Sequence, residues 1–265
     1  MAQRALAGDR VAGVARGGAG ARRVLQEQNA FPGLATRWLA RGARQIHLGF
    51  PEARARLAPG TATEVFALGN PIRPPVAGDP VAARRAFGLA PARLTVLAFG
   101  GSQGARALNF ALAGALEHRR LPDVNLLWGT GTVHEAELAT YAASSRVVVR
   151  GFFDPMADAY RAADLVVCRA GAMTVAELCA WGKPSVLVPL PTAAADHQTY
   201  NARALAVAGA AVLLPERELD ANRLARELRD LLGDPARLAS LAAAARGRGH
   251  PDAARDVVSR ILTLI

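Results

Sequence analysis

Cysteine is scarce in this sequence, which has only Cys168 and Cys179 among its 265 residues. Two cysteines cannot build the disulfide framework of a small secreted domain, and neither has partners at metal-ligand spacing. The HExxH pattern of zinc peptidases and the Ser/His/Asp order of serine hydrolases are also missing. We therefore expect two reduced thiols in the core, no metal site and no cofactor.

Long hydrophobic runs are absent too, although 51% of the residues are hydrophobic. No apolar run approaches the ~18 residues that a membrane-spanning helix needs. The chain does not open with a basic segment followed by an apolar stretch, as a secretory signal peptide does. We expect a chain that is not exported and that has enough apolar side chains for one large or two smaller α/β domains.

Lysine and aromatic residues are rare as well. Lys183 is the only lysine, so arginines supply nearly all of the positive side chains behind the net charge of +10, and aromatic residues make up 5% of the chain. The arginines are dispersed, and no stretch interleaves them with aromatics as a nucleic-acid platform would. The composition argues against nucleic-acid binding and leaves attraction to an anionic membrane surface, which needs only diffuse charge.

What the chain does contain, from Leu94 onward, is a regular alternation of apolar and helical patterns. This alternation predicts a parallel, doubly wound α/β sheet. We expect strands at 94–99, 123–128, 146–150, 164–168, 185–188 and 211–214. We expect helices near 104–118, 132–143, 155–162, 172–181, 197–208, 220–232, 235–247 and 251–263.

The chain before Leu94 is less regular. Residues 1–23 are rich in Arg, Gly and Ala and indicate either a poorly packed leader or a misassigned start. Residues 24–68 hold short apolar segments and a predicted helix from Gly33 to Arg41. Residues 69–80 contain four prolines, which predicts a connection between domains.

The segment 169–205 is the most informative part of the sequence. An apolar strand leads into a turn of small residues at Gly171, and a helix opens at Ala172-Met173-Thr174. The next strand ends in a Pro-rich loop, and a further helix begins near His197. Two helix N-termini at the carboxyl ends of neighbouring parallel strands offer free backbone N–H groups, which suit a diphosphate. Glu177, in the first turns of its helix, suits a ribose diol.

A glycine-rich loop follows the predicted strand 94–99. Gly100-Gly101-Ser102-Gln103-Gly104 precedes a helix, an arrangement that favours phosphate binding. The spacing is not GxGxxG, and Asp123 precedes its strand instead of ending it, so a dinucleotide-binding fold is disfavoured. The alternative for this loop is a tight strand-to-helix turn.

Other candidate ligand residues also have structural interpretations. Glu177 either accepts ribose hydroxyls, is a solvated helix acid, or forms a capping box three residues after Thr174. Gln198 suits sugar hydroxyls, whereas His197 beside it is either functional or a helix cap or surface group.

Two polar segments before Leu94 also have both a ligand-binding and a structural interpretation. Glu27-Gln28-Asn29 follows an apolar pair and is either a ligand loop at a strand end or an ordinary turn. Arg73, in the Pro-rich connection, either reaches a diphosphate or is a linker side chain.

Taken together, these segments resemble the MurG family, the bacterial transferases that add N-acetylglucosamine (GlcNAc) to lipid-linked muramoyl-pentapeptide. The shared segments lie in order between about residues 24 and 260: EQNAFPG, GNPIR, FGGSQGARALN, GFFDPMADAYRAADLVVCRAGAMTVAEL and GKPSVLVPLPTAAADHQTYNA. The resemblance implies a GT-B glycosyltransferase with two Rossmann-like domains around a cleft. It also implies an inverting transferase that moves GlcNAc from UDP-GlcNAc to the lipid-linked acceptor, in peptidoglycan synthesis. Such an enzyme is peripheral, on the cytoplasmic face of the cell membrane.

The resemblance also implies a domain division and a donor site. Residues 1–70 would be the remnant of the acceptor domain, 71–250 the UDP-GlcNAc-binding domain, and 251–265 a helix packing back on the N-terminal part. The positions that match the family's donor contacts are Arg73, Gly101, Ser102 and Gln103 for the diphosphate, Phe153 for a main-chain contact with uracil, Ala172, Met173 and Thr174 for diphosphate and sugar, Glu177 for ribose, and Asn29, His197 and Gln198 for the sugar.

The chain departs from the family pattern at its beginning. Family members carry a longer N-terminal segment, whose GGTGGHxxPA loop holds the acceptor diphosphate and a candidate base histidine. GGAGARR at 17–23 is only superficially similar, and Gln26 stands where the family usually has His. The resemblance therefore leaves the catalytic base unassigned, and we expect very weak transfer or none from this chain alone. The alternatives are a fragment that binds UDP-GlcNAc without transfer, and another enzyme of this fold such as a UDP-GlcNAc 2-epimerase.

Overall fold

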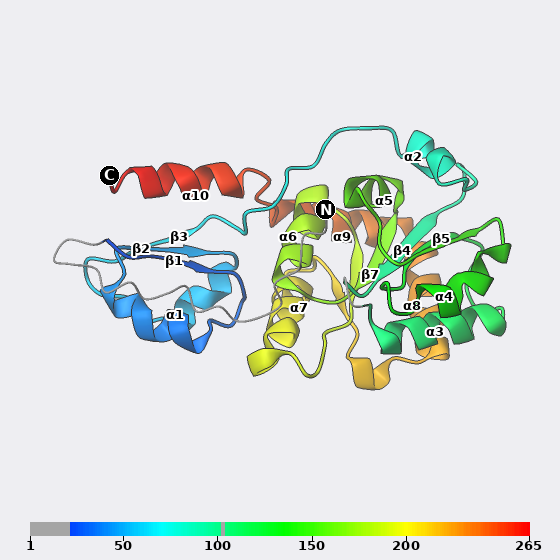
Figure 1. Cartoon of the computed structure of the whole chain (residues 1–265), viewed down its shortest axis with the longest axis horizontal. Coiled ribbons are helices and arrows are strands. Elements are labelled where there is room, and N and C mark those ends of the chain that lie inside the picture. Colours follow the sequence, from blue (N-terminus) through cyan, green and yellow to red (C-terminus); the bar gives the residue numbers. More distant parts are fainter. Residues whose placement is uncertain (1–21, 102–103) are drawn as a thin grey trace.

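The computed structural model describes residues 22–101 and 104–265 and contains two parallel β-sheets (Figure 1). A three-stranded sheet has the order β1-β2-β3, and a six-stranded sheet has the order β6-β5-β4-β7-β8-β9. Every strand pair in both sheets is parallel. The predicted doubly wound α/β architecture is confirmed.

The elements have the following bounds. The strands are β1 Val24–Glu27, β2 Gln45–Leu48, β3 Glu64–Ala67, β4 Thr95–Phe99, β5 Asn125–Gly129, β6 Val147–Arg150, β7 Leu165–Cys168, β8 Ser185–Leu187 and β9 Val212–Leu213. The α-helices are α1 Leu34–Leu39, α2 Pro80–Ala86, α3 Arg106–Glu117, α4 Glu135–Leu138, α5 Met156–Ala162, α6 Ala172–Trp181, α7 His197–Val207, α8 Ala221–Leu232, α9 Pro235–Gly247 and α10 Ala253–Leu262. Short 3₁₀ helices span Ala40–Gly42, Pro51–Arg56, Ala139–Ala143, Ala194–Asp196 and Glu216–Glu218.

The six-stranded sheet carries helices on both faces, which is why its inner strands are almost uniformly apolar. Leu108 of α3 and Leu224 of α8 belong to the core on one face. Tyr160 of α5, Val175 of α6 and Leu205 of α7 belong to the core on the other. The strand order places β4 beside β7, with their following helices on opposite faces, so the loops after these two strands diverge. Such a switch point is where open α/β sheets bind ligands.

The three-stranded sheet occupies the region where the sequence predicted only short apolar segments and one helix. Ile46 and Leu48 of β2 pack with Ala40 and Ala53 in a small separate core. The predicted helix from Gly33 to Arg41 is present, but its α-helical part ends at Leu39 and continues as a 3₁₀ turn.

Two other predictions need correction. The region predicted as one helix at 132–143 is a short α4 followed by a 3₁₀ helix. Helix α2 was not predicted at all. It begins directly after the Pro-rich connection, with Pro80 in its first turn and the Asp79 side chain accepting from the N–H groups of Val81 and Ala82.

A part-buried ion pair attaches α2 to the large sheet. Arg84 places Nη2 2.7 Å from both carboxylate oxygens of Asp164, and its Nε donates to the carbonyl of Ala162. Asp164 also accepts from the N–H of Thr95. Lys183 donates to the carbonyl of Ala163 close by, and burial lowers the pKa of its ammonium group to about 8. This cluster lies at the amino ends of β4 and β7, away from the ligand end of the sheet.

The chain passes between the two sheets twice. The first crossing follows β3, at Gly69 and Asn70, and the second follows α9 and leads into α10, which lies on the small sheet (Figure 1). The guanidinium of Arg260 on α10 is 4.4 Å from the ring centroid of Phe66 on β3.

Two further observations concern the composition. No helix in the described residues is both long and apolar enough to cross a membrane. Both cysteines are buried and unpaired, and burial raises the pKa of each thiol.

Candidate functional site

The described part of the loop after β4 has a backbone path that favours glycine at three positions, Gly100, Gly101 and Gly104. Gly104 has φ +73°, and a Cβ there would lie 2.2 Å from the carbonyl oxygen of Thr130. A Cβ on Gly100 would lie 2.2 Å from the backbone nitrogen of Ala105. Gly101 also has a positive φ, of +88°. Ser102 and Gln103, predicted to contact the diphosphate, lie outside the described residues.

Helices α3 and α6 both start at this end of the sheet without a side-chain cap. Their N-cap residues are Ala105 and Gly171, neither of which has a side-chain acceptor. No side chain of the described residues caps the N–H groups of either first turn, so these groups can bind an anion, and the helix dipoles favour negative charge there. The first turn of α6 contains Ala172, Met173 and Thr174, the predicted diphosphate and sugar contacts.

Glu177 lies on the first turns of α6 and is held by an aromatic hydroxyl. Tyr160 of α5 donates to its Oε2 at 2.9 Å. Burial raises the pKa of the Glu177 carboxyl, while the Tyr160 hydrogen bond and the nearby positive charge of Arg73 act in the opposite direction. The capping-box alternative is wrong, because α6 begins at Ala172 and its N-cap is Gly171, not Thr174.

Two side-chain amides near this end have orientations fixed by their backbone partners. The N–H groups of Ala170 and Leu190 both point at one terminal atom of Gln198, at 3.2 and 3.0 Å. A backbone N–H can only donate, so that atom is the oxygen. The Nε2 group of Gln198 has no partner among the described residues, which leaves it free to donate to a ligand.

Asn29 is oriented in the same way through a second amide. The N–H of Ala30 donates to Oδ1 of Asn201 at 2.8 Å, and Nδ2 of Asn201 donates to the carbonyl of Ala170 at 3.1 Å. That Nδ2 also lies 3.1 Å from Oδ1 of Asn29. The Nδ2 group of Asn29 therefore remains as a donor, like that of Gln198. Both amides suit ligand oxygens that accept hydrogen bonds.

The remaining predicted residues differ in their positions relative to this end of the sheet. Arg73 is exposed in the connection after β3, and its charge acts on Glu177. Phe153 is a core residue whose ring packs edge-on against Phe87 at 5.7 Å, so a ligand could meet only its backbone. Nδ1 of His197 lies 2.7 Å from the carbonyl oxygen of Ala194, a local contact at the start of α7.

Sequence reasoning missed Tyr160, Asn70 and Asn201 as parts of this arrangement. The signal for Asn201 was a polar residue on the buried side of a helix, four positions before the buried Leu205. Asn70 is buried in the first crossing, where its Nδ2 donates to the carbonyl of Gln28 at 2.9 Å and lies 3.5 Å from that of Ala172. In the described part of the chain, no three His, Cys, Asp or Glu side chains gather as a metal site.

Comparisons with known proteins agree with this architecture. Residues 95–257 match the family model "Glycosyltransferase family 28 C-terminal domain". The UDP-N-acetylglucosamine–N-acetylmuramyl-(pentapeptide) pyrophosphoryl-undecaprenol N-acetylglucosamine transferase of Chlorobaculum parvum is 45% identical over 249 residues, which cover 92% of this chain and 67% of that protein.

Solved structures give the same result. The crystal structure of Acinetobacter baumannii MurG matches with a TM-score of 0.71 and 31% identity, over 91% of this chain and 68% of that one. A putative UDP-N-acetylglucosamine 2-epimerase from Listeria monocytogenes matches at 18% identity and a TM-score of 0.57, covering 83% of this chain and 59% of that one, which shows a shared fold alone. This chain belongs to the MurG family of glycosyltransferases, and residues 95–257 are its family 28 C-terminal domain.

Proposed function

We propose that this chain acts in the transfer of GlcNAc from UDP-GlcNAc to lipid-linked muramoyl-pentapeptide, and that its six-stranded sheet holds the UDP-GlcNAc donor. The printed activity of the Chlorobaculum parvum relative supports the reaction. The domain division 1–70, 71–250 and 251–265 is part of the proposal, with the donor in the middle segment.

The observation that carries the proposal is the convergence of donor groups at the β4–β7 switch point. Two uncapped helix N-termini open there, and Glu177 lies on one of them. The amides of Gln198 and Asn29 both present N–H groups. A nucleotide sugar needs this combination, because its diphosphate and sugar oxygens accept hydrogen bonds while its ribose diol donates them.

In this assignment the chain's own groups stabilise the departing UDP. As the bond between GlcNAc and the diphosphate breaks, negative charge develops on the diphosphate. The N–H groups of α3 and α6 and the guanidinium of Arg73 would stabilise that charge. Glu177 would hold the ribose, and Gln198, Asn29 and His197 would position the sugar. The main chain at Phe153 would meet the uracil.

The small sheet carries features that suit an anionic membrane surface. Leu34 and Trp38 are 60% and 80% exposed, and their i, i+4 spacing puts them on one face of α1. Beyond α1 is an open depression of about 730 Å³. Among the described residues its lining includes four arginines and no acidic residue. These are Arg22, Arg23, Arg41 and Arg44.

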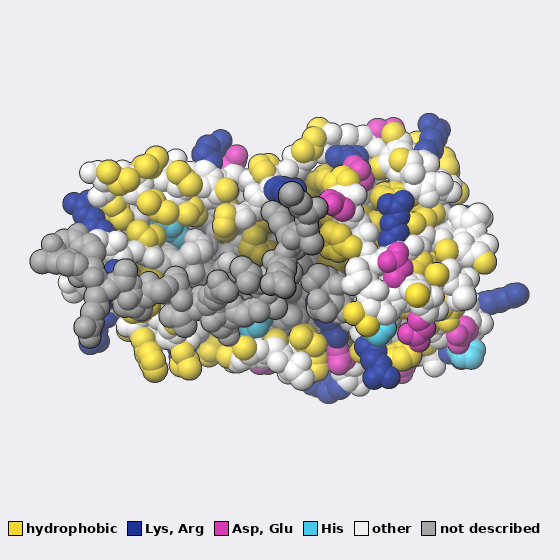
Figure 2. Space-filling model, viewed as in Figure 1, with side chains coloured by type: hydrophobic (Ala, Val, Ile, Leu, Met, Phe, Trp, Pro, Cys, Tyr) yellow, Lys and Arg dark blue, Asp and Glu magenta, His cyan; other side chains and the backbone are white. Residues whose placement is uncertain are grey.

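Apolar side chains beside arginines are the pattern of a protein that lies on a membrane. Elsewhere, on the face in Figure 2, arginines are scattered singly among other side chains. We assign the chain to the cytoplasmic membrane face as a peripheral protein on this basis.

A transfer assay tests the function. Radiolabelled UDP-GlcNAc is incubated with a lipid-linked muramoyl-pentapeptide, and labelled lipid product is measured. In parallel calorimetry of donor binding, we expect Glu177→Gln to weaken binding by about 1–3 kcal/mol, whereas Glu64→Gln, at an exposed glutamate on β3, should leave it unchanged.

The alternatives give different combinations of donor binding, lipid product and epimer product. Donor binding without product would restrict the proposal to a donor-binding role. Conversion of UDP-GlcNAc to its 2-epimer without any acceptor would replace the transferase by an epimerase. Absence of donor binding would refute the assigned site.

A further inference from the structure

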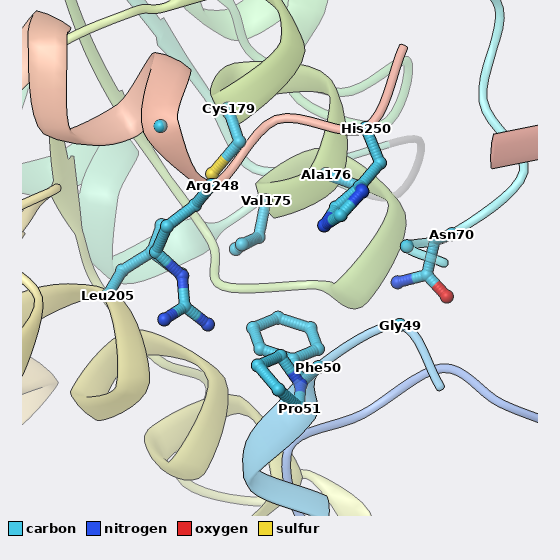
Figure 3. Close-up of a pocket in the computed structure, with 12 residues that line it drawn as sticks. Gly49, Phe50, Pro51, Asn70, Val175, Ala176, Cys179, Leu205, Arg248 and His250 are labelled. Carbon is cyan, nitrogen blue, oxygen red and sulfur yellow. The ribbon is translucent and has the colours of Figure 1, made fainter. Parts of the chain in front are cut away.

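A cavity of about 170 Å³ lies where the chain crosses between the two sheets (Figure 3). Both crossings line it. The first contributes Gly69 and Asn70, and the second contributes Gly247, Arg248 and His250. None of the described residues assigned above as UDP-GlcNAc contacts lines this cavity, although Asn70, which lies beside them, does. The cavity therefore adjoins the donor site, against the same helix, α6, without sharing its assigned ligand contacts.

The body of the cavity is apolar and rigid. Phe50 comes from the small sheet's side, while Val175 and Cys179 come from α6 and Leu205 from α7. All four side chains are buried, so their positions are fixed by packing against the core. In Figure 3 the Phe50 ring lies across the space from Val175. A flat ring as one wall suits an aromatic or similarly compact apolar group.

Two basic side chains border this apolar space. Arg248 forms an ion pair with Glu52, in which Nη2 lies 2.8 Å from Oε1 and 2.9 Å from Oε2. Its Nε and Nη1 have no hydrogen-bond partner in the described parts of the chain. In Figure 3 the Arg248 guanidinium and the His250 ring both point toward the space that the Phe50 ring borders. The Nε and Nη1 groups of Arg248 would favour a ligand that carries a carboxylate.

The size sets the class of ligand. A cavity of ~150 Å³ with apolar walls holds one benzene molecule. The cavity here is slightly larger and has basic groups at its border. We propose that this cavity, which we name the crossing cavity, binds a small aromatic carboxylate and that the bound ligand restrains the two sheets relative to each other.

The restraint follows because the residues that line the cavity come from different parts of the fold. A ligand between Phe50 and Val175 would contact both sheet units and both crossings at once. Asn70 extends the effect, because its Nδ2 donates to the carbonyl of Gln28 and lies within 3.5 Å of that of Ala172. Ala172 opens helix α6, whose first turn is part of the donor site. A ligand in the crossing cavity would therefore contact Asn70, whose Nδ2 connects to the donor site through the carbonyl of Ala172.

Benzoate is the probe, and its binding to the full chain is measured by NMR titration. We expect saturable binding in the millimolar range, which is ordinary for so small a ligand. Arg248→Gln should weaken it at least about tenfold, because charge-assisted hydrogen bonds are the strong ones. Ala176→Leu places a larger side chain in the cavity and should abolish binding. Ala243→Leu, an exposed alanine on α9, is the control and should bind as wild type does.

Hydrogen exchange tests the restraint itself. Benzoate should slow exchange at residues 69–70 and 247–250 in wild type and in Ala243→Leu, and not in Ala176→Leu. Equal affinity of wild type, Ala176→Leu and Arg248→Gln for benzoate would overturn the site, and so would the absence of saturable binding. Equal affinity for benzyl alcohol would refute the role of the carboxylate. Binding with unchanged exchange would refute the restraint.

UDP titration in parallel keeps this proposal distinct from the proposed function. UDP that still binds Ala176→Leu shows that the variant is folded, so a loss of benzoate binding is then specific to the cavity. If UDP fails to bind even the wild type, the donor assignment fails while the benzoate result stands on its own.

Discussion

The carboxyl group of Glu177 is under opposing influences. Burial favours its neutral form, whereas the Tyr160 hydroxyl and the Arg73 charge favour its ionised form. Its assigned task needs the ionised form, because a carboxylate accepts hydrogen bonds from both ribose hydroxyls. Since the pKa is raised, protonation sets in at a higher pH than for an ordinary glutamate. Ribose binding should therefore depend on pH.

We predict that uridine, which has the ribose but no phosphate of its own to titrate, binds best at neutral pH. Its affinity should fall as the pH drops through the raised pKa of Glu177. Loss of a hydrogen bond to a charged group costs about 1–3 kcal/mol, or roughly fivefold to over a hundredfold in affinity. Calorimetry from neutral pH down to the pH at which an ordinary glutamate titrates measures this.

Matched variants and ligands separate Glu177 from other titrating groups. Glu177→Gln should bind uridine weakly at every pH, and 2′-deoxyuridine should show a smaller pH effect. Tyr160→Phe removes a hydrogen bond that lowers the pKa, so the midpoint should move to higher pH. A pH profile that is the same in Glu177→Gln as in wild type would exclude Glu177 as the ribose acid.

At the scale of elements, the Gly100–Gly104 loop is constrained by contact as well as by φ. We predict that Gly104→Ala is much more destabilising than Gly88→Ala. Both glycines have positive φ, at +73° and +72°, so both variants incur a left-handed penalty of about 1–2 kcal/mol. Only at Gly104 would the new Cβ also collide, with the Thr130 carbonyl, whereas Gly88 has open space around it. Overpacking adds about 1–3 kcal/mol.

Urea unfolding of both variants measures the difference. Equal loss of stability would mean that the loop after β4 moves aside, and that its path is not fixed by the contact with Thr130. Gly104→Ala should also weaken UDP binding, because the loop carries the candidate diphosphate contacts.

The elements that the sequence predicted well are those in which each residue's role is local. From Leu94 onward, apolar strands and helices alternate with few interruptions, and apart from the helix expected at 132–143 the predicted elements are found within a few residues of their expected bounds. Helix α2 was missed because the prolines before it predicted a connection and not a helix start. Its attachment also depends on Asp164, 80 residues away in the sequence. Strands β1 to β3 are only four residues each, too short for a period to stand out.

The Arg84–Asp164 pair is expected to be the main attachment of α2. We predict that Arg84→Ala destabilises the chain by about 2–3 kcal/mol, since breaking this part-buried pair leaves Asp164 without its nearest counter-charge. The neighbouring Arg85 is exposed, and Arg85→Ala should change stability by less than about 0.5 kcal/mol. Chemical unfolding gives both values. Similar values for the two variants would mean that apolar contacts, and not the ion pair, hold α2.

At the scale of the whole molecule, side chains from distant parts of the chain hold the two sheets together. Asn201 of α7 bonds Asn29, 172 residues earlier in the chain. Beside it, the rings of Phe31 and Tyr200 stack at 4.6 Å, with the Arg56 guanidinium within about 5 Å of each. These contacts bring the loop after β1 to the end of the large sheet where the donor residues lie.

Contacts of this kind explain which part of the site could be predicted. The glycine loop and the first turn of α6 depend on neighbours in sequence, so spacing alone indicated them. The orientation of Asn29 depends on Asn201, and the setting of Glu177 on Tyr160, from other elements of the fold. Sequence patterns do not reveal such pairings, because each partner also has an ordinary interpretation in its own helix.

The last prediction concerns how the molecule meets a membrane. Trp38→Ala should weaken association with anionic vesicles by about fivefold or more, because a large exposed apolar side chain would insert at the interface and loses about 1–2 kcal/mol of burial when truncated. Val207→Ala is the control, since Val207 is 84% exposed but lies on α7, far along the chain from the arginine-lined depression. Vesicle sedimentation measures both.

The arginines supply the second part of the attraction, and it has a different signature. Arg41→Gln with Arg44→Gln should lower vesicle binding by about 1 kcal/mol per charge at low salt, and by less at high salt, where charge is screened. Neither the arginine changes nor Trp38→Ala and Val207→Ala should alter UDP affinity, because none of these residues belongs to the donor site. If Val207→Ala weakens vesicle binding as much as Trp38→Ala does, the membrane-facing surface is not the one that α1 presents, and the orientation proposed for the whole molecule is wrong.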